Sequence, residues 1–318
     1  MRRRGSSAAG HPPASQEELP SVVAGPRRHR SGRRVGTPSE APRPPTEQVA
    51  LGFGGPEDVV EVDVPGGSEA GRILLGPHAV SEALRGGRRE VQVVFLSAEE
   101  RGERFREIAR LAKQRGVPSR QADPDLLETL AAGRVHQGIA ALAGPYPYLG
   151  LGDVERIAVE RGAETLAVAL DQVQDPQNLG AITRSSVAFG VDVVVMPERR
   201  AAGVTDAVVR ASAGATELMR IARVPNLAEA LRRLSGAGVE VVGLDPEGEA
   251  DLATADLHPP VCLVFGAEGP GLRRLTRELC HRRVRIPIAA GGVASLNISV
   301  AAGIVLHAIR HPHRTERP

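Results

Sequence analysis

Short apolar runs and longer segments of helical periodicity alternate along the chain between residues 73 and 310. The short runs are rich in β-branched residues, whereas the longer segments carry apolar residues three or four positions apart, which is typical of amphipathic helices. Strands are predicted at residues 73–76, 91–96, 137–142, 165–170, 192–196, 219–224, 240–244, 261–265 and 284–288. Helices are predicted at residues 79–84, 99–114, 124–132, 153–161, 179–189, 206–214, 227–234, 272–280 and 298–309. From residue 165 onward, this order favours an α/β domain with a mostly parallel sheet and helices on both faces.

Composition divides the chain into four regions. Residues 1–71 are rich in Pro, Gly, Ser and Arg, become acidic towards their end, and are expected to form a disordered tail. Residues 72–144 are expected to form a small α/β domain. Residues 145–163 are expected to be a linker with a connecting helix, because Pro145 and Pro147 restrict the backbone. Residues 164–318 are expected to form the larger α/β domain.

A glycine-rich loop follows the predicted strand 261–265. Gly266, Gly269 and Gly271 allow the backbone to turn tightly and to approach a ligand, and Glu268 is the only ionisable residue between them. Their spacing, G-x-x-G-x-G, is the reverse of the dinucleotide fingerprint G-x-G-x-x-G, of which no strong copy occurs elsewhere in the chain. An NAD-dependent oxidoreductase is therefore disfavoured.

A second loop, residues 289–294, follows the predicted strand 284–288 and leads to Ser295 and Asn297 at the start of the last predicted helix. Ser and Asn are common N-cap residues, so helix capping alone could explain both. However, two such loops in succession at the carboxyl ends of parallel strands favour a ligand-binding crevice.

Polar residues also follow the predicted strand 165–170. Pro176 and Gly180 shape a turn, Asn178 lies near the start of the next helix, and Arg184 lies six residues further on. These two polar residues are within two helical turns of each other. Taken singly, Asn178 is interpreted as a helix cap and Arg184 as a solvated surface charge.

Charge and aromatic content narrow the possible RNA contacts. The 318-residue chain has a net charge of +2, and Lys113 is the only lysine among its 40 basic residues. Arginine suits phosphate recognition, but a GC-rich genome produces the same bias. With no Trp, two Tyr and five Phe, an aromatic platform for single-stranded RNA is not expected. Any RNA contact would depend on arginine and backbone groups.

The cysteines and the hydropathy of the chain bear on its location. Cys262 and Cys280 are too few and too far apart for a zinc site, and they are expected to be packing residues of a reduced, cytoplasmic protein. No run of about 18 apolar residues indicates a membrane span. We therefore expect a cytoplasmic protein without a metal and without a membrane partner.

Three segments together resemble the motifs of a known enzyme family. They are DPQNLGAITRS at 175–185, FGAEGPGLRRLTRELC at 265–280, and IPI at 286–288 followed by SLNISVAAGI at 295–304. They look like the three motifs of the SpoU (TrmH-type) RNA ribose 2′-O-methyltransferases of the SPOUT superfamily. In the small domain, LLGPHAVSEAL at 74–84 and RVHQGIAAL at 134–142 resemble the ribosomal-protein L30e-like RNA-binding domain of the bacterial enzymes that methylate a guanosine in the P loop of 23S rRNA. The resemblance covers about residues 73–310.

This resemblance implies a fold, a cofactor and partners. The fold would be an L30e-like RNA-binding domain followed by a SPOUT-type parallel-sheet catalytic domain with a C-terminal trefoil knot. The protein would be a homodimer acting on 23S rRNA, without a metal. The cofactor would be S-adenosylmethionine, held in the knot largely by backbone groups. The residues at the matching positions are Gly266, Ala267, Ile286, Ile288 and Leu296.

The resemblance also implies roles for five polar residues. Methyl transfer to a ribose 2′-oxygen needs in-line alignment and loss of the hydroxyl proton, so the enzyme contributes mainly positioning and electrostatics. Arg184 would bind phosphate and stabilise the developing alkoxide, because a guanidinium is effectively never deprotonated in proteins. Asn178 would orient Arg184 or the ribose, and Glu268 would hold the loop and the substrate. Ser295 and Asn297 would shape the knot and the target pocket.

Two departures from the family pattern affect the cofactor contacts. The loop 289–294 is one residue longer than in the most similar members, and Pro270 replaces a charged or polar residue. Two other functions stay open at this point. The substrate could be a tRNA or another rRNA site, or the protein could be a non-catalytic RNA-binding factor of ribosome assembly, since fold alone does not determine function.

Overall fold

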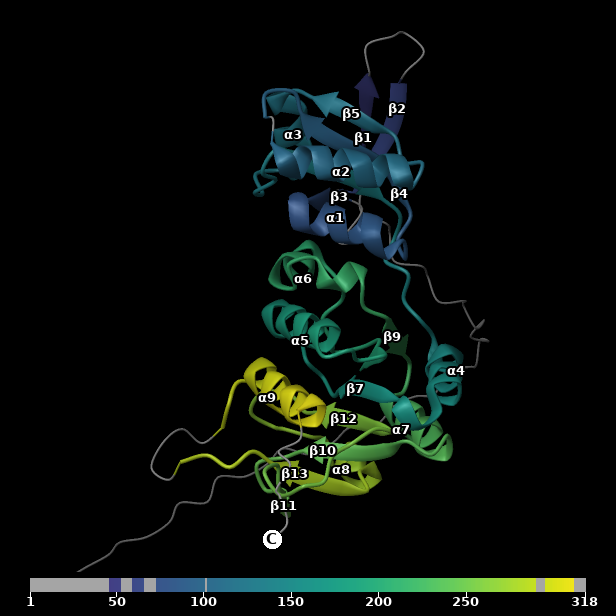
Figure 1. Ribbon diagram of the computed structural model, residues 1–318, viewed down its shortest axis with the longest axis vertical. Coiled ribbons are helices and arrows are strands. Elements are labelled where there is room, and N and C mark those ends of the chain that lie inside the picture. The colour runs from purple at the N-terminus through teal and green to yellow at the C-terminus, as the bar shows by residue number, and fades with distance from the viewer. Residues whose placement is uncertain (1–45, 53–58, 66–72, 101, 290–294, 312–318) are drawn as a thin grey trace, which may run out of the picture. The chain divides into compact units, whose positions relative to one another are not determined.

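The structure, a computed structural model, describes residues 46–52, 59–65, 73–100, 102–289 and 295–311. Figure 1 shows the course of the chain through the helices and strands. Within the predicted tail, β1 (Thr46–Gly52) and β2 (Val59–Pro65) form a two-stranded antiparallel sheet. The structure differs here from the expected disorder, because valine alternates with acidic residues at 60–64, and a period of two favours a strand. The remaining residues of 1–71 lie outside the described residues.

A four-stranded sheet follows, in the order β3-β6-β4-β5. β6 pairs antiparallel with both β3 and β4, whereas β4 and β5 are parallel. Alternate residues of β4 enter different buried clusters: Val94 shares one with Ile108, and Phe95 shares another with Leu127. The elements are β3 (Ile73–Leu75), α1 (Pro77–Gly86), β4 (Val91–Ser97), α2 (Glu103–Gln114), β5 (Ser119–Ala122), α3 (Pro124–Ala131) and β6 (Ile139–Ala143).

A seven-stranded sheet forms the larger part of the structure. Its order is β11-β13-β10-β12-β7-β8-β9, and every neighbouring pair is parallel. Its strands are β7 (Leu166–Leu170), β8 (Val193–Pro197), β9 (Ile221–Val224), β10 (Glu240–Leu244), β11 (Ala250–Asp251), β12 (Val261–Phe265) and β13 (Arg282–Arg285). Its helices are α4 (Leu151–Arg161), η1 (Gly162–Glu164), α5 (Pro176–Ala188), α6 (Asp206–Ala211), η2 (Ala215–Glu217), α7 (Leu227–Gly236), α8 (Arg274–Leu279) and α9 (Ile298–Arg310). This confirms the predicted α/β fold with a mostly parallel sheet.

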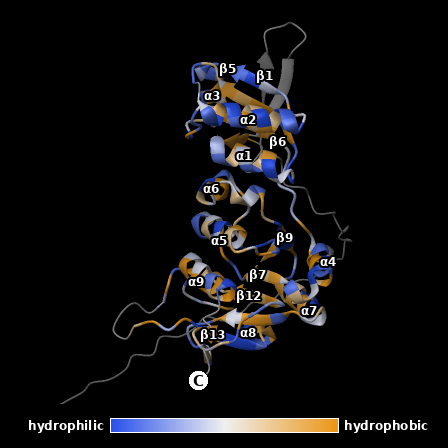
Figure 2. Cartoon of the chain, viewed as in Figure 1, coloured by the Kyte–Doolittle hydropathy of each residue, from blue (hydrophilic) through white to orange (hydrophobic). Residues whose placement is uncertain are grey.

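The central strand β12 is buried on both faces. Leu263 and Phe265 belong to the buried cluster that includes residues of α5, α6 and α9, whereas Cys262 and Val264 belong to the cluster that includes residues of α4 and α7. The strands β7 and β12 are accordingly largely apolar in Figure 2, whereas the outer strand β13 contains three arginines. The sheet is rigidly held between two layers of helices, so its carboxyl ends offer a firm base for loops.

Several helix and strand boundaries differ from the predicted ones, and the start of α2 differs for a reason that the hydrogen bonds show. α2 starts at Glu103 rather than at residue 99, because the Ser97 hydroxyl accepts the N–H groups of Glu99 (3.3 Å) and Glu100 (3.4 Å) and holds a turn. β13 ends at Arg285 rather than at residue 288. α8 starts at Arg274 rather than at residue 272. The edge strands β5 and β11 were not predicted; β5 has a single buried residue and β11 only two residues.

Both cysteines pack as predicted. Cys262 is completely buried in β12, and the Cys280 thiol donates to the Thr276 carbonyl (3.2 Å). Burial raises the pKa of the Cys280 thiol to about 11 and also raises that of Cys262, so both thiols are protonated at neutral pH. Among the described residues, no helix is long and apolar enough to cross a membrane.

Candidate active site

A large pocket lies beside the carboxyl ends of β10, β12 and β13. Its volume is about 860 Å³, within the range of small-molecule sites. Its main walls are the segments 244–247, 265–271, 284–288 and 295–298. The five residues predicted to bind a cofactor all line it: Gly266, Ala267, Ile286, Ile288 and Leu296. Of the predicted catalytic residues, Glu268, Ser295 and Asn297 also line it.

The loop after β12 is a tight hairpin that presents Glu268. The Ala267 N–H donates to the Gly271 carbonyl (3.1 Å), and the Gly271 N–H donates to the Ala267 carbonyl (2.9 Å). Gly269 and Gly271 have φ values of 84° and 67°, which glycine adopts without strain. A Cβ on Gly266 would lie 2.2 Å from the carbonyl carbon of Gly271, so no side chain fits there. The predicted glycine requirement therefore has a direct cause in this hairpin.

Glu268, Asn178 and Asn297 form one hydrogen-bonded network at the rim of the pocket. The Asn178 amide Nδ2 donates to Glu268 Oε1 (2.7 Å), and the Asn297 Nδ2 donates to the same oxygen (3.0 Å). The Asn297 Nδ2 also donates to Asn178 Oδ1 (3.0 Å). The three predicted motifs thus meet at one point. Along the chain, Asn178 lies 90 residues before Glu268, and Glu268 lies 29 residues before Asn297.

The carboxylate of Glu268 sets the orientation of both amides. An ionised carboxylate can only accept hydrogen bonds, so Asn178 and Asn297 both turn their amino groups towards it. Asn297 Oδ1 then faces the helix and accepts the Ser299 N–H (2.8 Å) and the Ser299 hydroxyl (2.6 Å). The result is a chain of oriented polar groups from the β12 loop to the start of α9.

Asn178, Ser295 and Asn297 were all candidates for helix caps, and of these three Asn297 alone is an N-cap. Asn297 is the N-cap of α9, as its type predicted, but the N-cap of α5 is Asp175, whose carboxylate accepts the Gln177 N–H (3.0 Å). Asn178 is therefore free of capping and is 5% exposed. Ser295 is exposed and does not cap α9. Glu268 accepts hydrogen bonds from Asn178 in the first turn of α5 and from Asn297 at the N-cap of α9, so it lies near the amino ends of both helices. The dipoles of these helices stabilise a negative charge there.

Arg184 lies apart from this network. It is exposed on α5, it is not among the residues that line the pocket, and it has no ion-pair partner within the described part of the chain. α5 nevertheless packs along α9, where Gly303 approaches the Ser185 hydroxyl. Because no described residue forms an ion pair with Arg184, its guanidinium remains available to a phosphate.

Four residues at the base of the site were not predicted. Asp171 and Asp245 follow β7 and β10 directly and are almost completely buried. Arg273 and Arg277 of the α8 region form ion pairs with them. A signal was available, because each aspartate stands at the carboxyl end of a predicted parallel strand, where ligand-binding residues gather.

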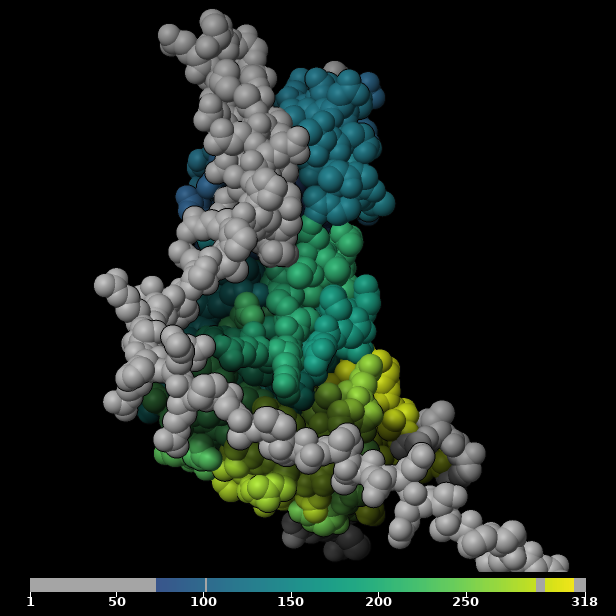
Figure 3. Space-filling model, turned by 180° about the vertical axis from the view of Figure 1, so that it is seen from behind, coloured from purple at the N-terminus to yellow at the C-terminus, as the bar shows by residue number. Residues whose placement is uncertain are grey.

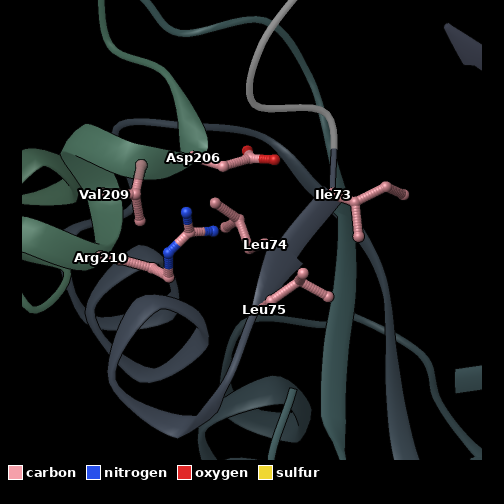
Figure 4. A pocket seen from close by; sticks show the side chains of 6 residues that line it. All are labelled: Ile73, Leu74, Leu75, Asp206, Val209 and Arg210. Carbon is pink, nitrogen blue, oxygen red and sulfur yellow. The ribbon is translucent and has the colours of Figure 1, made fainter. Parts of the chain in front are cut away.

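Other hollows and clusters are less informative. A hollow lined by Ile73, Leu74, Leu75, Asp206, Val209 and Arg210 has room for little more than one water molecule. Figure 4 shows Asp206 and Arg210 of α6 beside Leu74 in this hollow. Within the described ranges, no group of three or more His, Cys, Asp or Glu residues is arranged to hold a metal.

Comparison with known proteins places this site in a family context. Residues 165–307 match the SpoU rRNA methylase family, and residues 73–149 match the RNA 2′-O ribose methyltransferase substrate-binding family. An uncharacterised tRNA/rRNA methyltransferase of Mycolicibacterium gilvum is 43% identical over 76% of this chain and 77% of its own length. A putative TrmH family tRNA/rRNA methyltransferase of Bacillus subtilis, YacO, is 36% identical over 74% of this chain and 94% of its own length.

Solved structures show the same relationship. The SpoU methyltransferase AviRb of Streptomyces viridochromogenes, in complex with the cofactor AdoMet, has a TM-score of 0.61 and 29% identity, and covers 74% of this chain and 87% of its own. The AdoMet-bound rRNA methyltransferase of Sinorhizobium meliloti has a TM-score of 0.61 and 27% identity, with 74% and 84% covered. The chain therefore belongs to the SpoU rRNA methylase family.

Proposed function

We propose that the protein transfers a methyl group from S-adenosylmethionine to the ribose 2′-hydroxyl of a guanosine in 23S rRNA. Its membership of the SpoU family makes it an RNA 2′-O-methyltransferase that uses S-adenosylmethionine. The observation that carries the proposal is the network of Glu268, Asn178 and Asn297 at the rim of the 860 Å³ pocket. Three motifs distant in sequence converge there on one carboxylate.

The residues of the pocket suit S-adenosylmethionine. Ile286, Ile288 and Leu296 offer apolar surface for the adenine ring, and Gly266 exposes backbone groups close to the cavity. Four carboxylates and two arginines also line the pocket, and this acidic lining favours a ligand that carries a sulfonium cation. They are Asp245, Glu247, Asp251, Glu268, Arg277 and Arg285. When bound, S-adenosylmethionine supplies the methyl group on its sulfonium sulfur.

The protein's own residues position the ribose and stabilise charge. Asn178 and Glu268 hold the ribose in line with the methyl carbon, since alignment of this kind can lower the barrier by about 7–11 kcal/mol. Arg184 stays protonated, binds an RNA phosphate and stabilises the charge that develops on the 2′-oxygen. The hydroxyl proton leaves to water or to an RNA phosphate. Ser295 and Asn297 shape the target pocket.

The choice of 23S rRNA rests on the small domain, residues 72–144, whose motifs are similar to the L30e-like RNA-binding domain of the guanosine enzymes. The related proteins are named tRNA/rRNA methyltransferases, so methylation of a tRNA is the alternative within the same class. A non-catalytic assembly factor is disfavoured, because Asn178, Arg184 and Glu268 are all present. The proposed catalytic domain includes the trefoil knot implied by its family motifs; the loop 290–294 lies outside the described residues.

A comparison of cells with and without the gene tests the substrate. We expect one 2′-O-methylguanosine of 23S rRNA to disappear when the gene is deleted and to return when it is restored. Loss of methylation from a tRNA, with 23S rRNA unchanged, would overturn the substrate assignment. Purified protein that fails to bind S-adenosylmethionine would contradict the activity itself, whereas binding without methylation of any RNA would support the assembly factor.

The protein is proposed to work as a homodimer that uses the outer face of α9. Val300 and Ile304 lie one turn apart on α9 and are 50% and 40% exposed, while Ala302 and Leu306 on the opposite face are buried. Figure 3 shows that the yellow C-terminal part of the chain reaches the molecular surface. An exposed apolar stripe of this kind suits a second copy of the same surface related by a two-fold axis.

Replacing Val300 by glutamate is expected to convert the dimer into a monomer. A two-fold interface would bring two like charges together in a desolvated region, which costs several kcal/mol. Sedimentation velocity measures the mass, and circular dichroism reports whether the fold is intact. The matched control is Val159→Glu on α4, because Val159 is 68% exposed and is not part of the stripe. A dimeric Val300→Glu protein, or a monomeric wild type, would contradict this interface.

A further inference from the structure

The short helix α8 is tied to the sheet on both sides of β12. Asp171 directly follows β7 and Asp245 directly follows β10, and these two strands are the neighbours of β12 in the sheet. β12 leads through the Glu268 hairpin into α8. Arg273 and Arg277, four positions apart and therefore one helical turn apart, each reach one of these aspartates.

The first tie is a two-point contact with a buried carboxylate. Asp171 Oδ2 accepts the backbone N–H of Arg273 (3.1 Å), and Oδ1 accepts the Nε of its guanidinium (2.6 Å). The Asp171 side chain is completely buried, and its own N–H donates to the Phe265 carbonyl at the end of β12 (2.8 Å). Both ends of the Glu268 hairpin, Phe265 and Arg273, are thus held by one residue.

The second tie joins α8 to a wall of the pocket. The Nε of Arg277 lies 3.0 Å from Asp245 Oδ2, and the Asp245 side chain is only 3% exposed. Arg283 Nη1 of β13 lies 3.5 Å from the same oxygen. Asp245 Oδ1 accepts the Glu247 N–H (3.0 Å), and its backbone N–H donates to the Val284 carbonyl (3.0 Å). Asp245 therefore orders the segment 244–247, which lines the pocket together with the Glu268 hairpin.

Charged groups at these positions are costly unless they are paired. A buried carboxylate that loses its partner is strongly destabilised, so Asp171 depends on Arg273. Asp245 would keep Arg283 of β13 if Arg277 were lost, but Arg283 does not belong to α8 and cannot hold that helix. An ordinary surface pair on the same helix, Arg274 with Glu278, offers a contrast: its atoms are 3.4 Å apart and its side chains are 90% and 53% exposed. The burial of Asp171 and Asp245 distinguishes the two ties from such a pair.

We infer that Asp171–Arg273 and Asp245–Arg277 are positioning pairs that hold the Glu268 hairpin between two loops of the site. The inference rests on the proposed function, because it assigns the pocket to S-adenosylmethionine. Asp245–Arg277 sets the width of the cofactor pocket and acts on cofactor affinity. Asp171–Arg273 sets the position of Glu268 against Asn178 and acts on the rate of transfer. None of the four takes part in the methyl transfer itself: Asp171 and Arg273 act through the hairpin that they hold, and Asp245 and Arg277 hold the pocket wall of which they are part.

Replacing the arginine of each tie is expected to change a different kinetic constant. Arg277→Met should raise the KM for S-adenosylmethionine about tenfold and change kcat by less than about threefold. Arg273→Met should lower kcat about tenfold, with a smaller change in KM, because a misplaced Glu268 no longer aligns the ribose. Arg277→Lys should restore most of the cofactor affinity, since lysine retains the charge next to Asp245. The matched control Arg274→Met should leave both constants at the wild-type level.

The measurements are steady-state kinetics with full-length protein and RNA, calorimetric binding of S-adenosylmethionine, and thermal unfolding of each variant. Equal losses of KM and kcat in both Met variants, without rescue by Arg277→Lys, would indicate a purely structural role and overturn the inference. Wild-type behaviour of Arg277→Met and Arg273→Met would overturn it as well. If the wild type binds S-adenosylmethionine but methylates no RNA, the proposed function fails, and the calorimetric affinity of Arg277→Met still decides whether Asp245–Arg277 shapes the pocket.

Discussion

Replacing Arg184 by alanine is expected to lower kcat for RNA methylation by a factor of about 10²–10³, the usual effect of removing a donor that stabilises a developing oxyanion. This corresponds to about 3–4 kcal/mol of transition-state stabilisation. The affinity for S-adenosylmethionine should not change, because Arg184 does not line the pocket. Single-turnover methylation of RNA together with calorimetric binding of S-adenosylmethionine separates the two effects.

The position of Arg184 explains why kcat should fall while the affinity for S-adenosylmethionine stays the same. It is exposed on α5 without an ion-pair partner among the described residues, whereas many arginines of the structure are paired with carboxylates or carbonyls. Its removal thus leaves no buried group unsatisfied and should barely change the unfolding temperature. Arg184→Lys should recover only part of the rate, since lysine keeps the charge but loses the two-pronged contact with phosphate.

Arg232→Ala is the matched control for this variant. Arg232 lies on α7, and within the described ranges its ion pair is an exposed one with Glu229, with 3.8 Å between the charged atoms. Pairs of this kind contribute at most about 1 kcal/mol, and the variant should methylate RNA at the wild-type rate. An Arg184→Ala enzyme as fast as Arg232→Ala would remove Arg184 from the mechanism.

Much of the site could be predicted because its residues follow strands. The runs that became β7 and β12 are short and wholly apolar, and parallel strands place their carboxyl ends at one edge of the sheet. The loop of Glu268 was therefore expected at a ligand-binding crevice, whereas the role of Asn178 in the site came from the resemblance of its motif to the family. The glycines of the β12 loop were equally readable, since a side chain at Gly266 collides with its own hairpin.

The N-cap of α5 was also readable but was missed. Proline favours the first position of a helix, so Pro176 indicates that the cap is the residue before it, Asp175. Assigning the cap to Asp175 leaves Asn178 without a local function. The interpretation of Asn178 as a cap would then have given way to a role in the site.

The two ties of α8 could not have been predicted from spacing. Asp171 and Arg273 are 102 positions apart, and their contact depends on β7 lying directly beside β12. Strand order in a parallel sheet follows from how the crossover helices pack, which no local pattern encodes. The pairing of Asp171 with Arg273 therefore becomes apparent only when the order of the strands is known.

The network around Glu268 makes the second strong prediction: Glu268→Ala is expected to lower kcat about 100-fold, because small displacements of positioning groups have effects of this size. Without the carboxylate, the amino groups of Asn178 and Asn297 lose their common acceptor, and the orientation of both amides is no longer determined. Glu268→Gln keeps an acceptor oxygen but loses the charge near two helix amino ends, so a loss of about tenfold is expected.

A double-mutant cycle with Asn178→Ala tests whether the network acts as a unit. Because Asn178 and Glu268 share a hydrogen bond of 2.7 Å, the double variant should be only slightly slower than the slower single variant. Glu278→Ala on α8 serves as the control, since Glu278 is half exposed and, in the described part of the chain, forms an ion pair with Arg274. Fully additive losses in the cycle would mean that Asn178 and Glu268 act separately, and the convergence of the three motifs would then have no catalytic consequence.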